Sequence, residues 1–173
     1  MKSQSSSRLG PIVSEKPFVE EENLVSRSKI KLVDLFAGIG GFHYGIAAAA
    51  KKKRFAIEPL LVAEINEDCR DVYMANHNCA AEVFQTDVKK LDLSIRDQAD
   101  ILTAGFPCQP FSQAGHKLGF DDARGTLFFE IAEIIRIKKP KAIFLENVRH
   151  LYKHDNGRTF AVIRKILTDE LGY

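Results

Sequence analysis

Short apolar segments alternate with longer amphipathic segments along most of this chain. The apolar segments have the length of strands and cover residues 30–36, 59–64, 82–85, 100–104 and 141–146. Most of them lack the apolar–polar alternation of a half-exposed strand, and uninterrupted apolar runs of this length are typical of strands buried on both faces. The pattern predicts five parallel strands in one sheet.

The amphipathic segments between the strands predict helices. They cover residues 41–52, 66–76 and 126–137, and apolar positions 160, 163, 166, 167 and 171 indicate a last helix after Gly157. Asn66 is a candidate N-cap of the second helix. Strand–helix alternation favours the α/β class, with a doubly wound, Rossmann-like and mostly parallel sheet. Such folds bind ligands at the carboxyl ends of their strands, so the chemistry is expected just after each strand.

The composition is that of one globular domain, because 45% of the 173 residues are hydrophobic and 28% are charged. Residues 1–28 are rich in serine and glutamate and poor in apolar side chains. They predict a flexible N-terminal arm ahead of a domain that spans residues 29–173.

Several classes of protein are disfavoured by the composition. No apolar run approaches the ~20 residues of a membrane span, and no secretory signal is expected. Three cysteines without a C-x-x-C pair argue against a zinc ribbon or a disulfide framework and favour a reduced, intracellular compartment. The net charge of +2 permits contact with nucleic acid without predicting it.

Three glycines follow the first predicted strand, in the run D-L-F-A-G-I-G-G-F at residues 34–42. Gly38, Gly40 and Gly41 would let the backbone approach a ligand closely. The dinucleotide-binding pattern G-x-G-x-x-G needs a further glycine where His43 stands, so a nucleoside without a pyrophosphate fits better. A plain tight turn between strand and helix is the alternative.

Acidic residues follow the second and third predicted strands. Glu64 ends the second strand, where a carboxylate can accept hydrogen bonds from two ribose hydroxyls. Asp87 follows the third strand and could accept a hydrogen bond from the amino group of adenine. The alternatives are a solvated charge for Glu64 and a helix-cap or turn residue for Asp87. The nearby glycine turn favours the ribose-binding interpretation of Glu64.

A cysteine and a glutamate mark the ends of the fourth and fifth strands. Cys108 stands in P-C-Q-P at residues 107–110, and the prolines hold it at the sheet edge because they fix φ and extend neither a helix nor a central strand. A nucleophilic cysteine is therefore predicted, whereas Cys69 and Cys79 are expected to be packing residues. Glu146 ends an apolar run, where a carboxylate is costly unless it is partnered. It is either a proton donor or a structural carboxylate in a salt bridge.

Four runs together resemble the ordered motifs of the cytosine-C5 DNA methyltransferase family. They are D-L-F-A-G-I-G-G-F, P-C-Q-P-F-S, R-G-T-L-F at residues 124–128 and E-N-V at residues 146–148. The resemblance covers residues 31–173 and is closest to bacterial members around residues 138–157. It implies the fold of S-adenosylmethionine-dependent methyltransferases and transfer of a methyl group to carbon 5 of a flipped cytosine in DNA. It also implies a restriction–modification enzyme of the bacterial cytoplasm.

The resemblance implies roles for the residues that match the family's catalytic motifs. The Cys108 thiolate would add to carbon 6 of cytosine, and Glu146 would hydrogen-bond the ring N3 and the amino group. Asn147 would support the loop that carries Cys108. Residues 113–124 match the loop that closes over DNA in the family. No metal is expected.

The resemblance also implies a set of cofactor-binding residues. Phe36 would stack on the adenine of S-adenosylmethionine, Glu64 would bind its ribose and Asp87 its amino group. The remaining members of the set form the glycine turn and the walls of the pocket: Gly38, Ile39, Gly40, Gly41, Ile65, Val88, Pro107 and Leu127.

The family's motifs continue beyond those present in these 173 residues. A Q-R-R-x-R-like segment, a target-recognition region and a last segment beside the cofactor are expected to be absent, so the fold is expected to be truncated before its last strands. Weak binding of S-adenosylmethionine and no methylation of DNA are then expected of the chain alone. The expected partners are double-stranded DNA and a second chain carrying the target-recognition region. The alternatives are a tRNA cytosine-C5 methyltransferase and an inactive cofactor-binding half that needs a partner chain.

Overall fold

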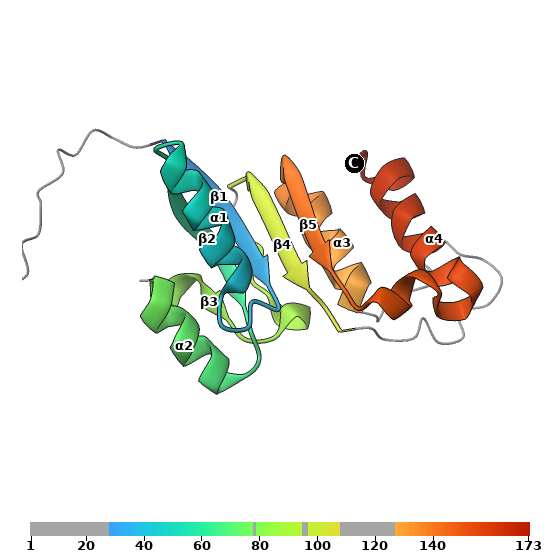
Figure 1. The fold of residues 1–173 in the computed structure, drawn as a ribbon, viewed down its shortest axis with the longest axis horizontal. Helices are drawn as coiled ribbons and strands as arrows, with labels where there is room; N and C mark the ends of the chain where they lie inside the picture. Colours follow the sequence, from blue (N-terminus) through green and yellow to red (C-terminus); the bar gives the residue numbers. More distant parts are fainter. Residues whose placement is uncertain (1–27, 78, 95–96, 108–126) are drawn as a thin grey trace, which may run out of the picture.

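The computed structural model describes residues 28–77, 79–94, 97–107 and 127–173 and shows one parallel sheet with helices on both faces (Figure 1). The strands are β1 (Lys29–Leu35), β2 (Ala56–Ala63), β3 (Phe84–Gln85), β4 (Ile101–Gly105) and β5 (Ala142–Glu146). They lie in the order β3-β2-β1-β4-β5. The chain winds outward from β1 to β3, returns to the centre at β4 and winds outward again. The winding therefore reverses between β1 and β4, the point where such sheets bind ligands.

The predicted doubly wound α/β fold is confirmed, because all five strands are present and each pairs in parallel with its neighbours. Two of their boundaries differ from the predicted ones by more than one residue. β3 is shorter than predicted because residues 81–83 form a 3₁₀ helix (Ala81–Val83). β2 begins at Ala56, ahead of Pro59, and tolerates this proline because the register with β1 shifts between Leu32 and Val33, beside it.

The expectation that the strands are buried on both faces holds for the inner strands and is wrong for β5. Residues 32–35 of β1 and 61–63 of β2 are almost entirely buried. On β5, Phe144 is 51% exposed and Glu146 is exposed as well. β5 is one of the two edge strands of the described sheet, so it has a neighbouring strand on one side only. This position explains its exposure.

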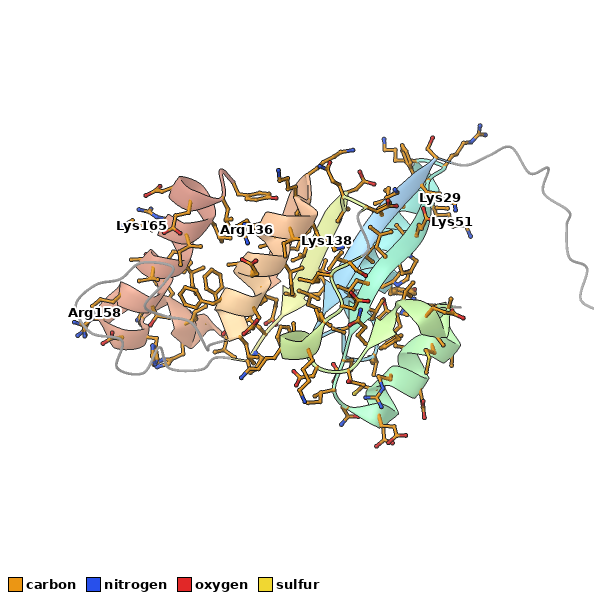
Figure 2. All side chains as sticks on the ribbon, turned by 180° about the vertical axis from the view of Figure 1, so that it is seen from behind. Lys29, Lys51, Arg136, Lys138, Arg158 and Lys165 are labelled. Carbon is orange, nitrogen blue, oxygen red and sulfur yellow. The ribbon has the colours of Figure 1, made fainter. Side chains whose placement is uncertain are left out.

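The helices agree closely with the predicted ones. They are α1 (Gly41–Lys52), α2 (Glu67–His77), α3 (Leu127–Lys138) and α4 (Arg158–Lys165), which continues into a π-helical turn (Ile166–Glu170). Figure 1 shows α1 in front of β1 and β2, and Figure 2, seen from behind, shows α3 across the opposite face. The side-chain oxygen of Asn66 accepts a hydrogen bond from the Cys69 amide (3.0 Å), so the predicted N-cap of α2 is confirmed.

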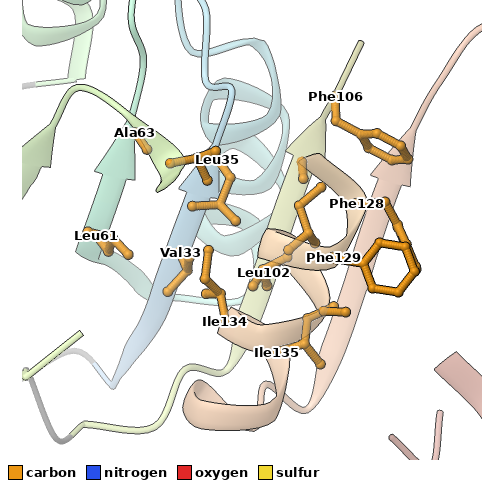
Figure 3. Close-up of a cluster of buried hydrophobic side chains, with 14 of the residues drawn as sticks. Val33, Leu35, Leu61, Ala63, Leu102, Phe106, Phe128, Phe129, Ile134 and Ile135 are labelled. Atoms are coloured by element: carbon orange, nitrogen blue, oxygen red, sulfur yellow. The ribbon is translucent and has the colours of Figure 1, made fainter. Parts of the chain in front are cut away.

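The main core lies between the sheet and α3 (Figure 3). Strand side chains such as Val33 and Leu102 face Phe128, Ile134 and Ile135 of α3, and all five are at most 2% exposed. A smaller cluster on the other face joins Ala37, Val62 and Tyr73. Neighbouring residues of a strand point to opposite faces, so Asp34, which follows Val33, points toward the smaller cluster.

The predicted arm of residues 1–28 lies outside the described residues except for Ser28. The Ser28 carbonyl accepts a hydrogen bond from the Ala56 amide (3.1 Å), which joins the start of β1 to the start of β2. In the described part of the chain, no helix combines the length and the apolar character needed to cross a membrane.

Candidate active site

The glycine turn after β1 has the backbone conformation that glycine favours. Gly38 and Gly40 have φ values of 53° and 91°. A hydrogen bond from the Gly40 amide to the Ala37 carbonyl (2.9 Å) closes the turn, and the Ala37 amide donates to the Ala63 carbonyl (3.0 Å) at the end of β2. A Cβ added to Gly38 or Gly41 would meet no described atom within 4 Å. The outer side of the turn is therefore open to a ligand.

Phe36 is the strained residue of the turn. Its φ of 53° lies in the left-handed region, which costs a non-glycine residue roughly 1–2 kcal/mol, and it ends β1 one residue earlier than predicted. The side chain is half-buried and packs against the main core. Strain of this kind is characteristic of ligand sites, where the surrounding structure holds it in place.

Glu64 connects the end of β2 to the glycine turn. Its Oε2 accepts a hydrogen bond from the Gly38 amide (2.8 Å), and its Oε1 accepts one from the Asn66 amide (2.7 Å). Each carboxylate oxygen has a second lone pair, so both oxygens can still accept from hydroxyl groups. The alternative of a merely solvated charge is excluded, because this carboxylate is fixed at the turn by two backbone donors.

Arg70 of α2 holds the backbone beside Glu64 and was not singled out from the sequence. Its Nη1 donates to the carbonyl of Ile65 (2.8 Å) and to that of Glu64 (3.2 Å). Its sequence position could have indicated this role. A positive charge near the start of a helix is disfavoured by the helix dipole, so such a side chain usually has a specific partner.

Asp87 occupies the cap position that was its alternative interpretation. Its Oδ1 accepts a hydrogen bond from the Lys89 amide (3.0 Å) at the start of the 3₁₀ helix Val88–Lys90. The Glu64 amide donates to the Gln85 carbonyl (3.2 Å), so the segment that carries Asp87 lies beside Glu64. The role of Asp87 toward adenine stays a prediction.

The apolar members of the predicted cofactor site differ in exposure. Ile39 and Ile65 are 59% and 73% exposed, and Pro107 is exposed too. Val88 is buried in the main core, and Leu127 packs against that core at the start of α3. Large apolar side chains exposed beside a polar turn are typical of a ligand-binding surface.

Glu146 lies where β5 meets the end of β4. It is the register partner of Gly105, and a Cβ added to Gly105 would lie 3.3 Å from the Glu146 Oε2. The carboxylate therefore lies close to the backbone that leads to Cys108. Cys108 itself and residues 113–124 lie outside the described residues, so the distance between the two predicted catalytic residues stays a prediction.

Asn147 ties the two strand ends together. Its Nδ2 donates to the Phe106 carbonyl (2.6 Å), and its Oδ1 accepts from the Val148 amide (2.9 Å). Phe106 stands two residues before Cys108, so this contact agrees with the expected support of the cysteine loop.

The other two cysteines are less buried than expected. Both Cys69 and Cys79 are only partly buried. Cys79 packs against the smaller cluster, where burial and then the charge of Asp34 raise the pKa of its thiol. A raised pKa keeps a thiol protonated and unreactive, so Cys79 is a poor nucleophile.

A buried chain of hydrogen bonds lies behind the glycine turn. Asp34 is fully buried, and it accepts hydrogen bonds from the Thr103 hydroxyl (2.6 Å) and the Tyr73 hydroxyl (3.3 Å). Tyr73 is also 2.8 Å from the Nδ1 of His43. Burial raises the pKa of Asp34 to about 6, although both hydroxyls lower it, and burial followed by the proximity of His77 lowers the pKa of His43 to about 4.

These two shifts have opposite effects on the pH dependence of stability. Folded Asp34 binds its proton more tightly than the unfolded chain, so its contribution to the free energy of unfolding falls as the pH rises from about 4 to about 6. Folded His43 binds its proton less tightly, so its contribution rises between about pH 4 and its ordinary pKa of 6.5. The two contributions largely cancel in the unmodified chain.

We expect Asp34→Asn to remove this cancellation. Between pH 4 and pH 6.5, the free energy of unfolding of the variant should rise by on the order of 3 kcal/mol, because only the His43 contribution remains. The free energy of unfolding of the unmodified chain should change little over the same range. Urea denaturation at several pH values measures it. Parallel pH profiles for the two proteins would contradict the assigned pKa shifts.

A doubly wound sheet with a glycine turn after β1 and a fixed acidic residue after β2 is the architecture of a nucleoside-cofactor enzyme. The model of the family described as C-5 cytosine-specific DNA methylase matches residues 30–173. The chain belongs to this family, and the predicted resemblance is confirmed.

Two curated relatives illustrate the match. The chain is 48% identical over 146 residues to Type II methyltransferase M1.ScrFI of Lactococcus lactis subsp. cremoris. This match covers 84% of this chain and 35% of the relative. It is 44% identical over 156 residues to Type II methyltransferase M.HpaII of Haemophilus parainfluenzae, covering 90% of this chain and 42% of the relative. The chain thus spans roughly two-fifths, or less, of the length of these relatives.

The crystal structure of S. pombe Dnmt2 methyltransferase has the same fold. The TM-score is 0.55 with 20% sequence identity, and the match covers 82% of this chain and 41% of that one.

Proposed function

We propose that this chain is the cofactor-binding and catalytic part of a DNA (cytosine-5)-methyltransferase. The observation that carries the proposal is the carboxylate of Glu64, fixed on the Gly38 amide at the point where the sheet winding reverses. The curated relatives carry the name Type II methyltransferase, which supports a role in a bacterial restriction–modification system acting in the cytoplasm.

The geometry of the turn suits S-adenosylmethionine. The outer side of Gly38 and Gly41 is open, and the oxygens of Glu64 can accept the two ribose hydroxyls. Phe36 would stack on the adenine, with Asp87 toward its amino group. Exposed Ile39 and Ile65 would pack against the bound cofactor. When bound, the cofactor supplies an electrophilic methyl group on a positively charged sulfur.

The proposed chemistry uses residues at the ends of β4 and β5. The Cys108 thiolate adds to carbon 6 of cytosine, and Glu146 donates a proton toward N3 as negative charge develops there. Carbon 5 then carries the electron pair of an enamine and can attack the methyl group. The electron pair of the broken bond to the methyl group stays on the sulfur. Loss of the carbon 5 proton to a water molecule, elimination of the Cys108 thiolate from carbon 6 and return of the N3 proton to Glu146 restore the aromatic ring. Asn147, which donates a hydrogen bond to the Phe106 carbonyl, would support the loop that carries Cys108.

Double-stranded DNA is the proposed substrate, with the target cytosine flipped out of the helix because a stacked base is inaccessible. The chain spans 35% of one relative and 42% of another. This partial coverage supports a target-recognition region outside these 173 residues, on a continuation of the chain or on a second chain.

Calorimetric titration with S-adenosylmethionine tests the proposal, with NAD as a control for the dinucleotide alternative. We expect weak, saturable binding of one S-adenosylmethionine per chain and no binding of NAD, because His43 replaces the glycine that a pyrophosphate site needs. The proposed cofactor would be wrong if S-adenosylmethionine and NAD bound equally well, or if S-adenosylmethionine did not bind at millimolar concentration. Robust methylation of plasmid DNA by the chain alone would contradict the placement of the target-recognition region.

A further inference from the structure

Four side chains behind the glycine turn have no part in the proposed chemistry. Asp34, His43, Tyr73 and His77 come from β1, α1 and α2 and meet on the face of the sheet opposite α3. Asp34 and Tyr73 are fully buried, and His43 is 5% exposed. Burying so many polar atoms is costly unless they hydrogen-bond to one another, which suggests that the cluster has a specific task.

The ring of His77 lies directly against the turn. A Cβ added to Gly40 would be 2.2 Å from the Nε2 of His77, 2.5 Å from its Cδ2 and 3.0 Å from the Cδ2 of Tyr73. A Cβ at Gly40 would force the His77 ring to shift, so His77 and Tyr73 form a wall in close contact with this glycine. Gly40 is also the N-cap residue of α1, with a φ of 91°.

The position of His77 is fixed by its neighbours. It stacks on His43, with ring centroids 4.1 Å apart and an interplanar angle of 13°, and its centroid is 4.7 Å from that of Tyr73. Tyr73 has one hydroxyl proton, which it donates to Asp34, so its oxygen accepts from His43. The His43 ring therefore carries its proton on Nδ1. These hydrogen bonds, from His43 to Tyr73 and from Tyr73 to Asp34, fix the two rings against which His77 packs.

We propose that His77, held by His43 and Tyr73, is a positioning residue that fixes the glycine turn in its cofactor-binding conformation. The inference rests on the proposed function for the identity of the ligand. Glu64 holds the turn at Gly38 from the front, and His77 supports it at Gly40 from behind. A turn fixed before the ligand arrives loses less conformational entropy on binding, so the wall increases affinity without touching the cofactor.

Three variants test the inference. His77→Ala removes the wall, His77→Phe keeps an aromatic ring in its place, and Val72→Ala is a control on the same helix, at a side chain that is 42% exposed. We expect the dissociation constant for S-adenosylmethionine to rise about tenfold in His77→Ala and less than threefold in His77→Phe and Val72→Ala. If His77→Phe keeps the affinity that His77→Ala loses, the loss comes from the missing ring beside the turn and not from a general loss of stability.

Hydrogen exchange in the ligand-free chain gives a second measurement. The Gly40 amide bonds to Ala37 and the Tyr44 amide to Gly40 (both 2.9 Å), so both report on the turn. We expect these two amides to exchange at least tenfold faster in His77→Ala, while the amides of central β1 keep their protection. Unchanged exchange at both positions, or an affinity within twofold of the unmodified chain, would overturn the inference.

The two measurements separate this inference from the proposed function. If the unmodified chain binds no S-adenosylmethionine, the proposed function fails for this chain, and the exchange rates still decide whether His77 positions the turn. If the cofactor binds and His77→Ala leaves either the exchange rates or the affinity unchanged, the positioning role is wrong and the proposed function stands.

Discussion

Replacing Cys108 with serine is expected to reduce methyl transfer by on the order of 10⁴-fold or more in the complete methyltransferase, while binding of S-adenosylmethionine stays within twofold. Methyl transfer needs the enamine, and the enamine needs a nucleophile on carbon 6. A cysteine thiol has a pKa near 8.5 and supplies some thiolate at neutral pH, whereas a serine hydroxyl supplies almost no alkoxide. Transfer of a labelled methyl group to duplex DNA measures the loss.

The matched controls are the two partly buried cysteines. Cys69→Ser and Cys79→Ser should keep near-normal turnover, with at most a loss of stability. A duplex containing 5-fluorocytosine should form a covalent adduct that maps to Cys108 alone, because fluorine cannot leave carbon 5 as the proton does. An adduct on Cys69 or Cys79, or turnover that survives in Cys108→Ser, shows that the nucleophile has been assigned wrongly.

Glu64→Ala is expected to weaken binding of S-adenosylmethionine by roughly 100-fold or more. The variant loses the proposed acceptor of the ribose hydroxyls. It also leaves the amides of Gly38 and Asn66 without the carboxylate that now accepts from both, so the turn loses its support from β2. Calorimetric titration measures the change in affinity.

Glu58→Ala is the control for Glu64→Ala. Glu58 is on the same strand, and its carboxylate pairs with Lys29 (3.2 Å) at the far end of β2, where the ion pair is partly exposed. Exposed pairs contribute little, so this variant should bind the cofactor normally. Equal losses in the two variants would mean that removal of any β2 carboxylate disturbs the domain, and Glu64 would have no special role.

The strand pattern was predictable from the sequence because buried parallel strands are continuous apolar runs, and four such runs became β1, β2, β4 and β5. Details that depend on tertiary contacts were not predictable. Pro59 looked like the start of a strand and lies inside β2, where the register shifts. Phe144 looked buried, and the edge position of β5 leaves it half-exposed.

The candidate site divides in a similar way. The glycine turn and Glu64 were predictable because each follows a strand directly, and the structure joins them through one hydrogen bond. Tyr73 and His77 were not, since their role depends on how α2 packs behind the turn, and the sequence shows them only as positions in a helix. The sequence position of Asp34 is informative, because a carboxylate inside a buried apolar strand needs hydrogen-bond partners. The structure supplies these partners in Thr103 and Tyr73.

The central claim is that S-adenosylmethionine binds at the carboxyl ends of β1 and β2, and a titration of the ¹⁵N-labelled chain followed by nuclear magnetic resonance tests it most directly. The account predicts shifts of the Gly38, Gly40, Gly41 and Asn66 amides that follow one binding curve, with the amides of α4 unchanged. Shifts confined to α4, or no shift at the glycine turn when the chain is saturated with cofactor, would contradict it.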